Sequence, residues 1–512
     1  MNSGQARTLL AQAGAALTVS ALIAGCGNNY RPVVTPITPS GPAAQVTSYV
    51  VVVSSTGPST PGVATIIDYS GDTIMADAPI GVNPSAFTID ELASEGYTVN
   101  GDGTLTNFPV TTTLQAKNVL VSTVPSAAVP VNMMAPSAGL WMADLDGNAV
   151  DVFSSVPETL KEPIPLVNTL PVSVFGPPTL TGQREYALSQ NVADTAPMTC
   201  NSSPRTAPLG SANPIEIASD TADPPITVGK CPVYAVMSSD QRRFFVLNRG
   251  DDTVTVINAQ NNTLDNQCPA PTGCVNQNGQ TYFTHPVLPL STSAVTATGV
   301  TPPNGTAGMT ATAGPVYGEY NSATQQLVIA NYDGGTVSVI DVSLDEYGND
   351  SSTFGTTYTI PVGNTATPNP ASVTVLADGS KAYTANQNDT ASGSVDGTVT
   401  VVNLSTHTAE KTLTVVGHPR TVASTQNSEY SKIYVASPDS PYVTIIQSTP
   451  TVTDQIDTTL LVEGTVVDLR VTTQNGTSGN ANFTSRIPGY GQPCNLPGAS
   501  QTVSIPKCQA IQ

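Results

Sequence analysis

The sequence predicts an all-β protein, and three observations support this prediction. A pair of short, β-prone runs joined by a tight turn recurs along the 512-residue chain. Valine, threonine and serine are frequent, and 43 prolines and 41 glycines interrupt the chain, a composition that favours strands and turns over helices. Beyond the N-terminus, no long stretch places apolar residues at the i, i+3, i+4, i+7 spacing of an amphipathic helix.

Residues 327–341, LVIANYDGGTVSVID, show the recurring pattern most clearly. The run before the turn is apolar, and residues 336–340 alternate apolar with hydroxyl side chains, which is the period of a strand with one buried face. Asp333, Gly334 and Gly335 supply a turn whose residues tolerate positive φ. The pattern therefore predicts a β-hairpin.

Six copies of this hairpin in register indicate a repeat architecture. The other copies are residues 244–258, 382–403 and 433–447, with weaker ones at 140–154 and 49–68. A further strand, in most copies introduced by a proline, is expected to precede each hairpin as the innermost strand of its unit. The expected starts of these inner strands are near Pro84, Val131, Pro171, Pro232, Pro315, Pro370, Pro419 and Val466.

The repeat resembles that of the YVTN family, whose unit reads roughly P-x-x-V-x-x-S-x-D-G-x-x-x-Y-V-x-N and then T-V-S-V-I-D. The best match is residues 369–403, with NPASVTVLADGSKAYTANQ and DGTVTVVN. The resemblance is clear over residues 229–464 and faint over 46–229. It implies a β-propeller of four-stranded blades. Insertions at 191–212, 262–279 and 291–313 depart from the family pattern.

The two ends of the chain are expected to close the propeller. A closed ring removes exposed sheet edges, and the first and last strands of a propeller usually share one blade. Residues 49–81 supply three strands without an inner one, and the strand near 466–473 would complete that blade. We therefore expect a single propeller of seven to eight blades. The alternative, an array of two-layer sandwiches, needs units of about 100 residues, whereas the repeat here spans roughly 40 to 60.

The N-terminus predicts export. Residues 1–25 have the features of a signal peptide, and the run from Leu22 to Cys26 resembles the bacterial lipobox. The resemblance implies a lipid on Cys26 and a membrane partner, and Gly27 after it favours the outer membrane. An ordinary secretory signal or an uncleaved anchor is the alternative. Residues 26–45 then form a Pro/Thr-rich linker, 46–475 the propeller, and 476–512 a C-terminal loop or tail.

Six cysteines follow the lipobox, and an even number in an exported chain suggests disulfides. Six cysteines permit 15 connectivities. Proximity along the chain favours three pairs, which are Cys200–Cys231, Cys268–Cys274 and Cys494–Cys508.

Composition excludes some functions and leaves few sites. The net charge of −20, with only 17 Lys and Arg, argues against nucleic acid as a partner, because nucleic-acid binding needs clustered cations. The chain has three histidines and none of the usual hydrolase, zincin or haem motifs, so no catalytic residue and no cofactor are predicted. Asp144 and Asp146 are weak calcium candidates, but their position in the repeat favours a turn role.

These observations favour a cell-surface module that binds or scaffolds, with an unknown protein or glycan as its ligand. Its long loops, 191–212 and 262–313, are the expected binding surface. One alternative is an exported lactonase-like or quinoprotein-like enzyme, which requires histidine, arginine and carboxylates at one mouth of the channel. The charged residues near inner strands are Arg420, Arg470, Glu319 and Asp90. Another alternative is a structural protein of the surface-layer type.

Overall fold

The structure is a computed structural model that describes most of the chain between residues 48 and 472. The described residues are 48–90, 92–124, 128, 130–135, 139–155, 158–176, 184–192, 200, 204–290, 313–389, 396–426, 431–449 and 452–472. The predicted signal peptide, the linker, the C-terminal tail and Cys26, Cys494 and Cys508 lie outside them. No helix among the described residues is long and apolar enough to span a bilayer.

The described strands form a β-propeller of eight blades, each built on four antiparallel strands. Blade 1 consists, from the inner to the outer strand, of β37 (Thr465–Val471), β1 (Tyr49–Ser55), β2 (Pro61–Asp68) and β3 (Thr73–Val82). Blade 2 consists of β4 (Pro84–Ile89), β5 (Glu95–Asn100), β6 (Thr104–Pro109) and β7 (Leu120–Thr123), with the short helix η1 (Ala116–Asn118) before β7.

In blades 3 to 5 the third strand pairs with two outer segments. Blade 3 consists of β8 (Pro130–Met134), β9 (Gly139–Asp144) and β10 (Ala149–Ser155), with β11 (Glu158–Leu160) and β12 (Ile164–Pro165) outside. Blade 4 consists of β13 (Pro171–Phe175), β14 (Arg184–Ser189) and β15 (Leu209–Glu216), with β16 (Thr221–Ala222) and β17 (Ile226–Lys230) outside and η2 (Pro204–Thr206) before β15. Blade 5 consists of β18 (Pro232–Met237), β19 (Arg243–Asn248) and β20 (Thr253–Asn258), with β21 (Thr263–Leu264) and β24 (Val287–Pro289) outside.

The last three blades are regular. Blade 6 consists of β25 (Pro315–Asn321), β26 (Gln326–Asn331), β27 (Thr336–Asp341) and β28 (Thr357–Pro361). Blade 7 consists of β29 (Pro370–Val375), β30 (Lys381–Asn386), β31 (Thr398–Asn403) and β32 (Thr408–Thr414). Blade 8 consists of β33 (Thr421–Ser424), β34 (Lys432–Ala436), β35 (Tyr442–Thr449) and β36 (Val452–Leu461).

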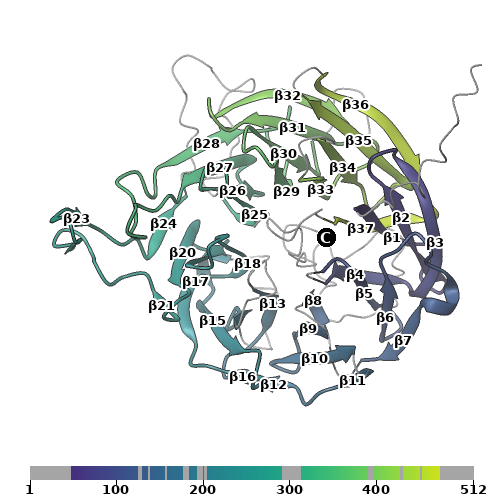
Figure 1. Cartoon of the computed structure of the whole chain (residues 1–512), viewed down its shortest axis with the longest axis horizontal. Helices are drawn as coiled ribbons and strands as arrows, with labels where there is room; N and C mark the ends of the chain where they lie inside the picture. The colour runs from purple at the N-terminus through teal and green to yellow at the C-terminus, as the bar shows by residue number, and fades with distance from the viewer. Residues whose placement is uncertain are drawn as a thin grey trace, which may run out of the picture. The chain divides into compact units, whose positions relative to one another are not determined.

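The eight inner strands contact one another in sequence around the centre, and Figure 1 shows them facing it. The predicted all-β propeller is confirmed, and the number of blades is eight. Six of the inner strands begin at a proline, and all eight begin within two residues of their predicted starts.

The first blade is closed by both ends of the chain, as predicted. Strand β1 pairs with β2 on one side and with β37 on the other, both antiparallel. Val52 lies opposite Leu469, and Val50 lies opposite Val471. All four side chains are buried, so the closing pair buries apolar surface as well as satisfying the edge of β1.

In four of the blades, an asparagine of the repeat ties the two strands of the hairpin together. In blade 6, the side-chain amide of Asn331 donates to Oγ1 of Thr336 (3.0 Å) and Oγ of Ser338 (2.8 Å). The same pair of bonds is made by Asn100, Asn248 and Asn386 in blades 2, 5 and 7. Because these amides are buried, they need partners, which explains why a threonine or serine follows the turn.

The turn carboxylates bind backbone. Asp251 accepts from the N–H of Lys230 (2.6 Å), Asp396 from Gly417 (3.0 Å) and Asp439 from His418 (2.8 Å), each in the segment that leads into an inner strand.

Asp144 has a turn contact of its own, since its Oδ1 accepts from the N–H of Asp146 at 3.2 Å, while Asp146 is exposed. Among the described residues, no three His, Cys, Asp or Glu side chains form a metal-binding group.

A lysine–tyrosine pair on the second strand of blades 7 and 8 holds a carboxylate of the next blade. Lys381 and Tyr383 each lie 2.5 Å from Asp454 of blade 8. Lys432 and Tyr434 lie 2.5 and 2.6 Å from Asp72 of blade 1. Burial alone would raise the pKa of Asp454, but hydrogen bonds from Lys381, Tyr383 and Ser448 outweigh it and lower the pKa.

We expect Asp454→Asn to lower the free energy of unfolding by about 1.5–3 kcal/mol at pH 7, since it removes hydrogen bonds to a charged group. Because the folded-state pKa is lowered, this stabilisation is complete above the unfolded-state pKa of about 3.9 and is lost as the pH falls through the folded-state pKa. Urea denaturation at pH 7 and pH 3 measures both effects. The exposed neighbour Asp457→Asn is the control; equal losses for the two variants would contradict the prediction.

Candidate binding site between blades 5 and 6

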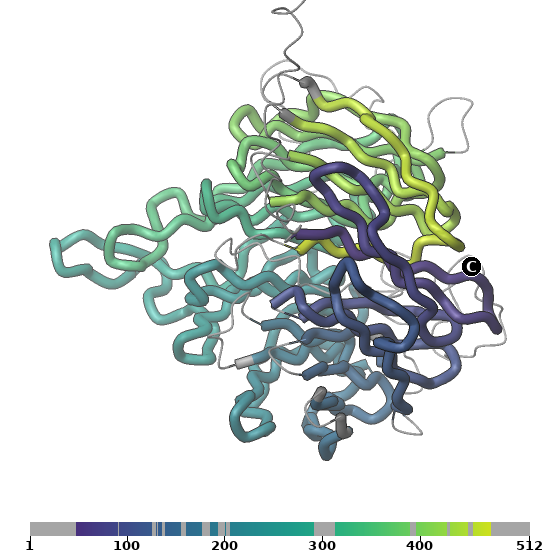
Figure 2. Tube along the Cα trace, turned by 45° about the vertical axis from the view of Figure 1, so that its right-hand side comes forward, coloured from purple at the N-terminus to yellow at the C-terminus, as the bar shows by residue number. Residues whose placement is uncertain are grey.

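Two insertions from neighbouring blades lie against each other and form what we call the arm, residues 265–286 and 343–356. The first follows β21 of blade 5 and contains the hairpin of β22 (Cys274–Val275) and β23 (Thr281–Tyr282). The second joins β27 to β28 in blade 6. Figures 1 and 2 show this part extending outward beyond the strands of its two blades.

Three kinds of contact hold the arm together. The predicted disulfide Cys268–Cys274 closes the base of the hairpin. At the tip, the side-chain amide of Asn278 donates across the two insertions to the hydroxyl of Tyr347 and, at 3.5 Å, to Glu346. The third contact is a group of buried charges at the base.

Arg243, the first residue of β19, lies at the centre of that charged group. Its Nε is 3.0 Å from Oδ2 of Asp265, and its Nη2 is 3.1 Å from Oδ1 of Asp350. The other oxygen of Asp350 is 2.9 Å from Nδ1 of His285, whose ring stacks on Phe354. Both carboxylates are almost completely buried, so one guanidinium joins each insertion of the arm to blade 5.

The group carries one more carboxylate than guanidinium. Burial raises the pKa of Asp265 to about 6; Arg243 opposes this shift and Asp350 adds to it. Since the folded-state pKa is raised, the stability that Asp265 contributes is complete below its unfolded-state pKa and is lost as the pH rises through about 6. Protonation of Asp265 is therefore expected to stabilise the folded state as the pH falls below about 6.

A cavity of about 180 Å³ lies beside Arg243. Its walls come from the β18–β19 turn of blade 5, from blade 6 and from the start of the second insertion. The lining residues are Ser238, Asp240, Arg242, Arg243, Tyr320, Gln325, Val342, Leu344 and Asp345. Most of these side chains are polar, and they include both carboxylates and guanidinium groups.

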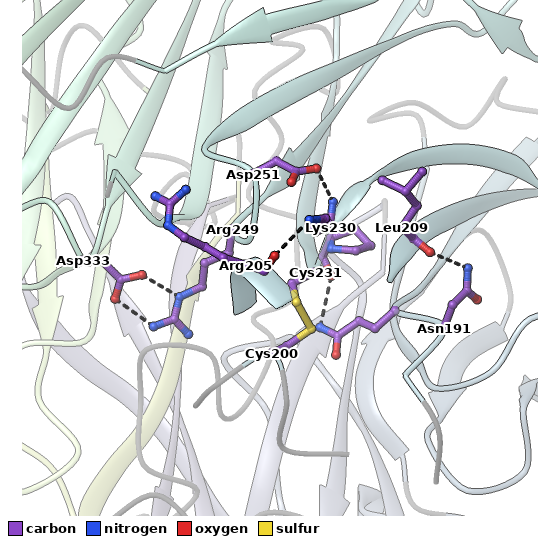
Figure 3. Close-up of a disulfide and its surroundings, with 11 residues drawn as sticks. Asn191, Cys200, Arg205, Leu209, Lys230, Cys231, Arg249, Asp251 and Asp333 are labelled. Atoms are coloured by element: carbon purple, nitrogen blue, oxygen red, sulfur yellow. Dashed lines mark hydrogen bonds and ion pairs between the residues drawn. A yellow bond between two sulfur atoms is a disulfide. The ribbon is translucent and has the colours of Figure 1, made fainter. Parts of the chain in front are cut away.

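The insertion at 191–212 is fastened to the start of blade 5 (Figure 3). The second predicted disulfide, Cys200–Cys231, joins it to the residue before β18. Figure 3 also draws bonds from Asn191 Nδ2 to the carbonyl of Leu209 (2.9 Å) and from Lys230 Nζ to the carbonyl of Arg205 (2.9 Å). In the same view, Arg249 bonds to both oxygens of Asp333 (2.8 and 2.9 Å). Both long insertions named from the sequence are thus tied to blade 5.

Two of the four charged residues predicted near the channel meet at the closing strand. Nη1 of Arg470 lies 2.8 Å from Oδ2 of Asp468, and its Nη2 donates to the carbonyl of Phe87 (3.3 Å). Arg420 donates to the carbonyl of Val467. These bonds join β37 to blades 8 and 2, so the arginines are engaged in closing the ring.

Glu319 and Asp90 make separate contacts. Oε2 of Glu319 accepts from the N–H of Val375 (2.5 Å), and burial raises the pKa of Glu319 to about 8. Asp90 accepts from the N–H groups of Ser94 and Glu95 in the turn after β4. The histidines have other partners: His285 pairs with Asp350, His418 pairs with Asp439, and His407 stacks on Tyr358.

The sequence indicated one of the two insertions that form the arm, but neither the other insertion nor the residues that form the site. Arg243 and Asp350 are 107 positions apart; Arg243 directly precedes the hairpin copy at 244–258 at a position for which the repeat predicted no role, and Asp350 lies in a loop. Only the length of the insertion at 262–313 pointed to a binding site in this part of the chain.

Comparison with known proteins supports the fold and no family. No family model matches the chain, and no curated protein matches it. A solved structure of AztD from Citrobacter koseri is similar, with a TM-score of 0.52 and 11% identity, over 83% of this chain and 98% of that one. A candidate 6-phosphogluconolactonase from Bacteroides fragilis gives a TM-score of 0.46 and 15% identity over 83% and 98%. At these identities the likeness shows the fold alone.

Proposed function

We propose that the protein is a binding module of the cell envelope and that the arm carries its binding surface. The observation that supports this most is the arm itself, in which two insertions from adjacent blades are joined by buried ion pairs at the base and by Asn278 at the tip. Loops held by a rigid scaffold are where binding residues concentrate. Apolar side chains are exposed on or beside the arm at Val275 (66%), Val287 (50%) and Tyr347 (36%).

The envelope location rests on the sequence, in which the run ending at Cys26 resembles a lipobox and the repeat resembles the YVTN type. A lipid on Cys26 would anchor the propeller through the linker at 26–45. Replacement of Cys26 by alanine is then expected to move the protein from the membrane fraction to the soluble fraction. Membrane association that persists in this variant would contradict the lipid anchor.

Site-specific photo-crosslinking in cells tests the binding surface. A photoreactive residue at position 275, on the arm, is expected to give a heteromeric adduct of defined mass. The same residue at position 167, where Val167 is 85% exposed away from the arm, is the matched control and is expected to give none. Adducts at neither position, or equally at both, would contradict the proposal. An adduct of twice the chain mass would instead support the structural, self-associating alternative.

The enzyme alternative has weaker support. It requires a histidine beside the arginines and carboxylates of the channel, and the three histidines have the partners described above. One of the similar solved structures is a candidate lactonase, and this likeness supports the enzyme alternative only weakly.

A further inference from the structure

The cavity beside Arg243 has walls that belong to three separate segments, so its shape depends on the arm. The turn of residues 238–243 forms one wall, Tyr320 and Gln325 of blade 6 form another, and Leu344 with Asp345 of the arm forms the third. A group that occupied the cavity would lie where the arm meets the ring. Its position therefore makes it part of the proposed binding surface, and the inference below rests on that proposed function.

The lining of the cavity contains both hydrogen-bond donors and acceptors. Asp240 and Asp345 present carboxylate oxygens, and Arg242 presents a guanidinium that is 41% exposed and only loosely paired, with its Nε 3.8 Å from Asp240. Oε1 of Gln325 accepts from the N–H of Leu344 (3.2 Å), so its amide nitrogen is the end directed to other partners. Tyr320 is 6% exposed, and its hydroxyl bonds to Ser239.

The backbone of the arm makes room for Arg242. Gly348 has a φ of +82°, and a Cβ built on it would lie 2.0 Å from Nη1 of Arg242. Any other residue would therefore displace the guanidinium. The loop that carries Gly348 is closed by Asp345, whose pKa is lowered because hydrogen bonds from the N–H groups of Asn349 and Tyr347 outweigh the effect of burial.

The chemistry of the walls selects among ligands. A bound anion would meet the carboxylates of Asp240 and Asp345, and a bound cation would meet Arg242 and Arg243; both arrangements are unfavourable in a partly enclosed site. An apolar ligand would cover the loosely paired guanidinium of Arg242 and the amide nitrogen of Gln325 without offering either of them a partner, which is costly. A neutral molecule whose hydroxyls both donate and accept can accept from these two groups and donate to the neighbouring carboxylates.

Size restricts the ligand further. The cavity of about 180 Å³ is smaller than the roughly 300–1,000 Å³ of pockets for drug-sized ligands. It therefore suits a single sugar ring. We propose that the cavity binds a terminal sugar residue of a neutral glycan.

Saturation-transfer NMR on the full-length protein in detergent tests this directly. The probes are glucose, galactose and N-acetylglucosamine, with glucuronate and glucosamine as the anionic and cationic counterparts. We expect saturation transfer to at least one neutral sugar and at least tenfold weaker binding of its charged counterparts. No transfer to any neutral sugar, or stronger binding of glucuronate or glucosamine, would overturn the inference.

Two variants locate the binding. Leu344→Phe is expected to fill the cavity and Arg242→Ala to remove its donor, and each should weaken sugar binding at least tenfold. Val167→Phe, at an exposed position away from the arm, should leave binding unchanged. Binding that persists in both cavity variants overturns the site. If position 275 still gives its crosslinked adduct while no sugar binds, the sugar site is contradicted and the arm remains the proposed binding surface. Sugar binding without an adduct would support the sugar site and contradict the arm as a surface that binds another macromolecule.

Discussion

Replacement of Arg243 by alanine is expected to lower the free energy of unfolding by about 3–5 kcal/mol, the usual cost of removing one partner from a buried ion pair. Arg243 is 5% exposed, and without it Asp265 and Asp350 would remain buried with no guanidinium between them. Protonation of one carboxyl would relieve part of the cost. The variant should therefore recover stability as the pH is lowered.

The loss should be concentrated in the arm. Hydrogen exchange of residues 265–286 and 343–356 is expected to accelerate more than that of the inner strands, because the arm depends on Arg243 for its attachment. Arg242→Ala is the matched control, since the neighbouring guanidinium is 41% exposed and exposed ion pairs contribute about 0–1 kcal/mol. If both variants lost less than about 1 kcal/mol, the charged group would not be what holds the arm.

Removal of the closing strand should have a larger effect still. A chain that ends at Gly464 lacks β37 and with it four buried apolar side chains, Val466, Val467, Leu469 and Val471. At roughly 1.5–3 kcal/mol each, these contribute about 6–12 kcal/mol, which is comparable to the whole net stability of a typical domain. The shortened chain is therefore expected to lose its cooperative unfolding transition.

A second truncation separates this effect from that of the tail. A chain that ends at Thr472 keeps β37 and the bond from the N–H of Thr472 to the carbonyl of Tyr49 (2.8 Å). It should unfold as the full chain does. Circular dichroism during urea denaturation, with size-exclusion chromatography for aggregation, makes the comparison. A cooperative transition in the chain ending at Gly464, at the midpoint of the longer one, would show that β37 does not close the ring.

Patterns within short stretches of the sequence predicted the strands and turns that those same stretches form. The hairpin at 327–341 carries its own turn and its own alternation, and the structure places β26 and β27 there. The inner strands were found through the prolines at which most begin. The number of blades was left at seven to eight because the repeat is faint over residues 46–229, where one unit could have been misread.

Long-range contacts could not be predicted in this way. The two-residue strands β16 and β21 owe their place to the strands they pair with, so their own sequences carry little signal. The same holds for the charged group: Asp265 and Asp350 lie on separate insertions, and neither is adjacent to Arg243 in the sequence. A charged residue in a loop is ordinarily solvated, and only the folded arm buries these three.

The pairing of β1 with β37 also means that the first blade cannot be completed until the last strand has been synthesised. Residue 471 is synthesised 416 positions after residue 55. At about 5–20 residues per second, this delay lasts roughly 20–80 s. Throughout it, the valine-rich strand YVVVVSS has been synthesised while its partner has not. A nascent chain with such an unpaired edge is prone to intermolecular association. The cell must keep the chain from associating, by a chaperone or by transport in an unfolded state, until its last strand has been made.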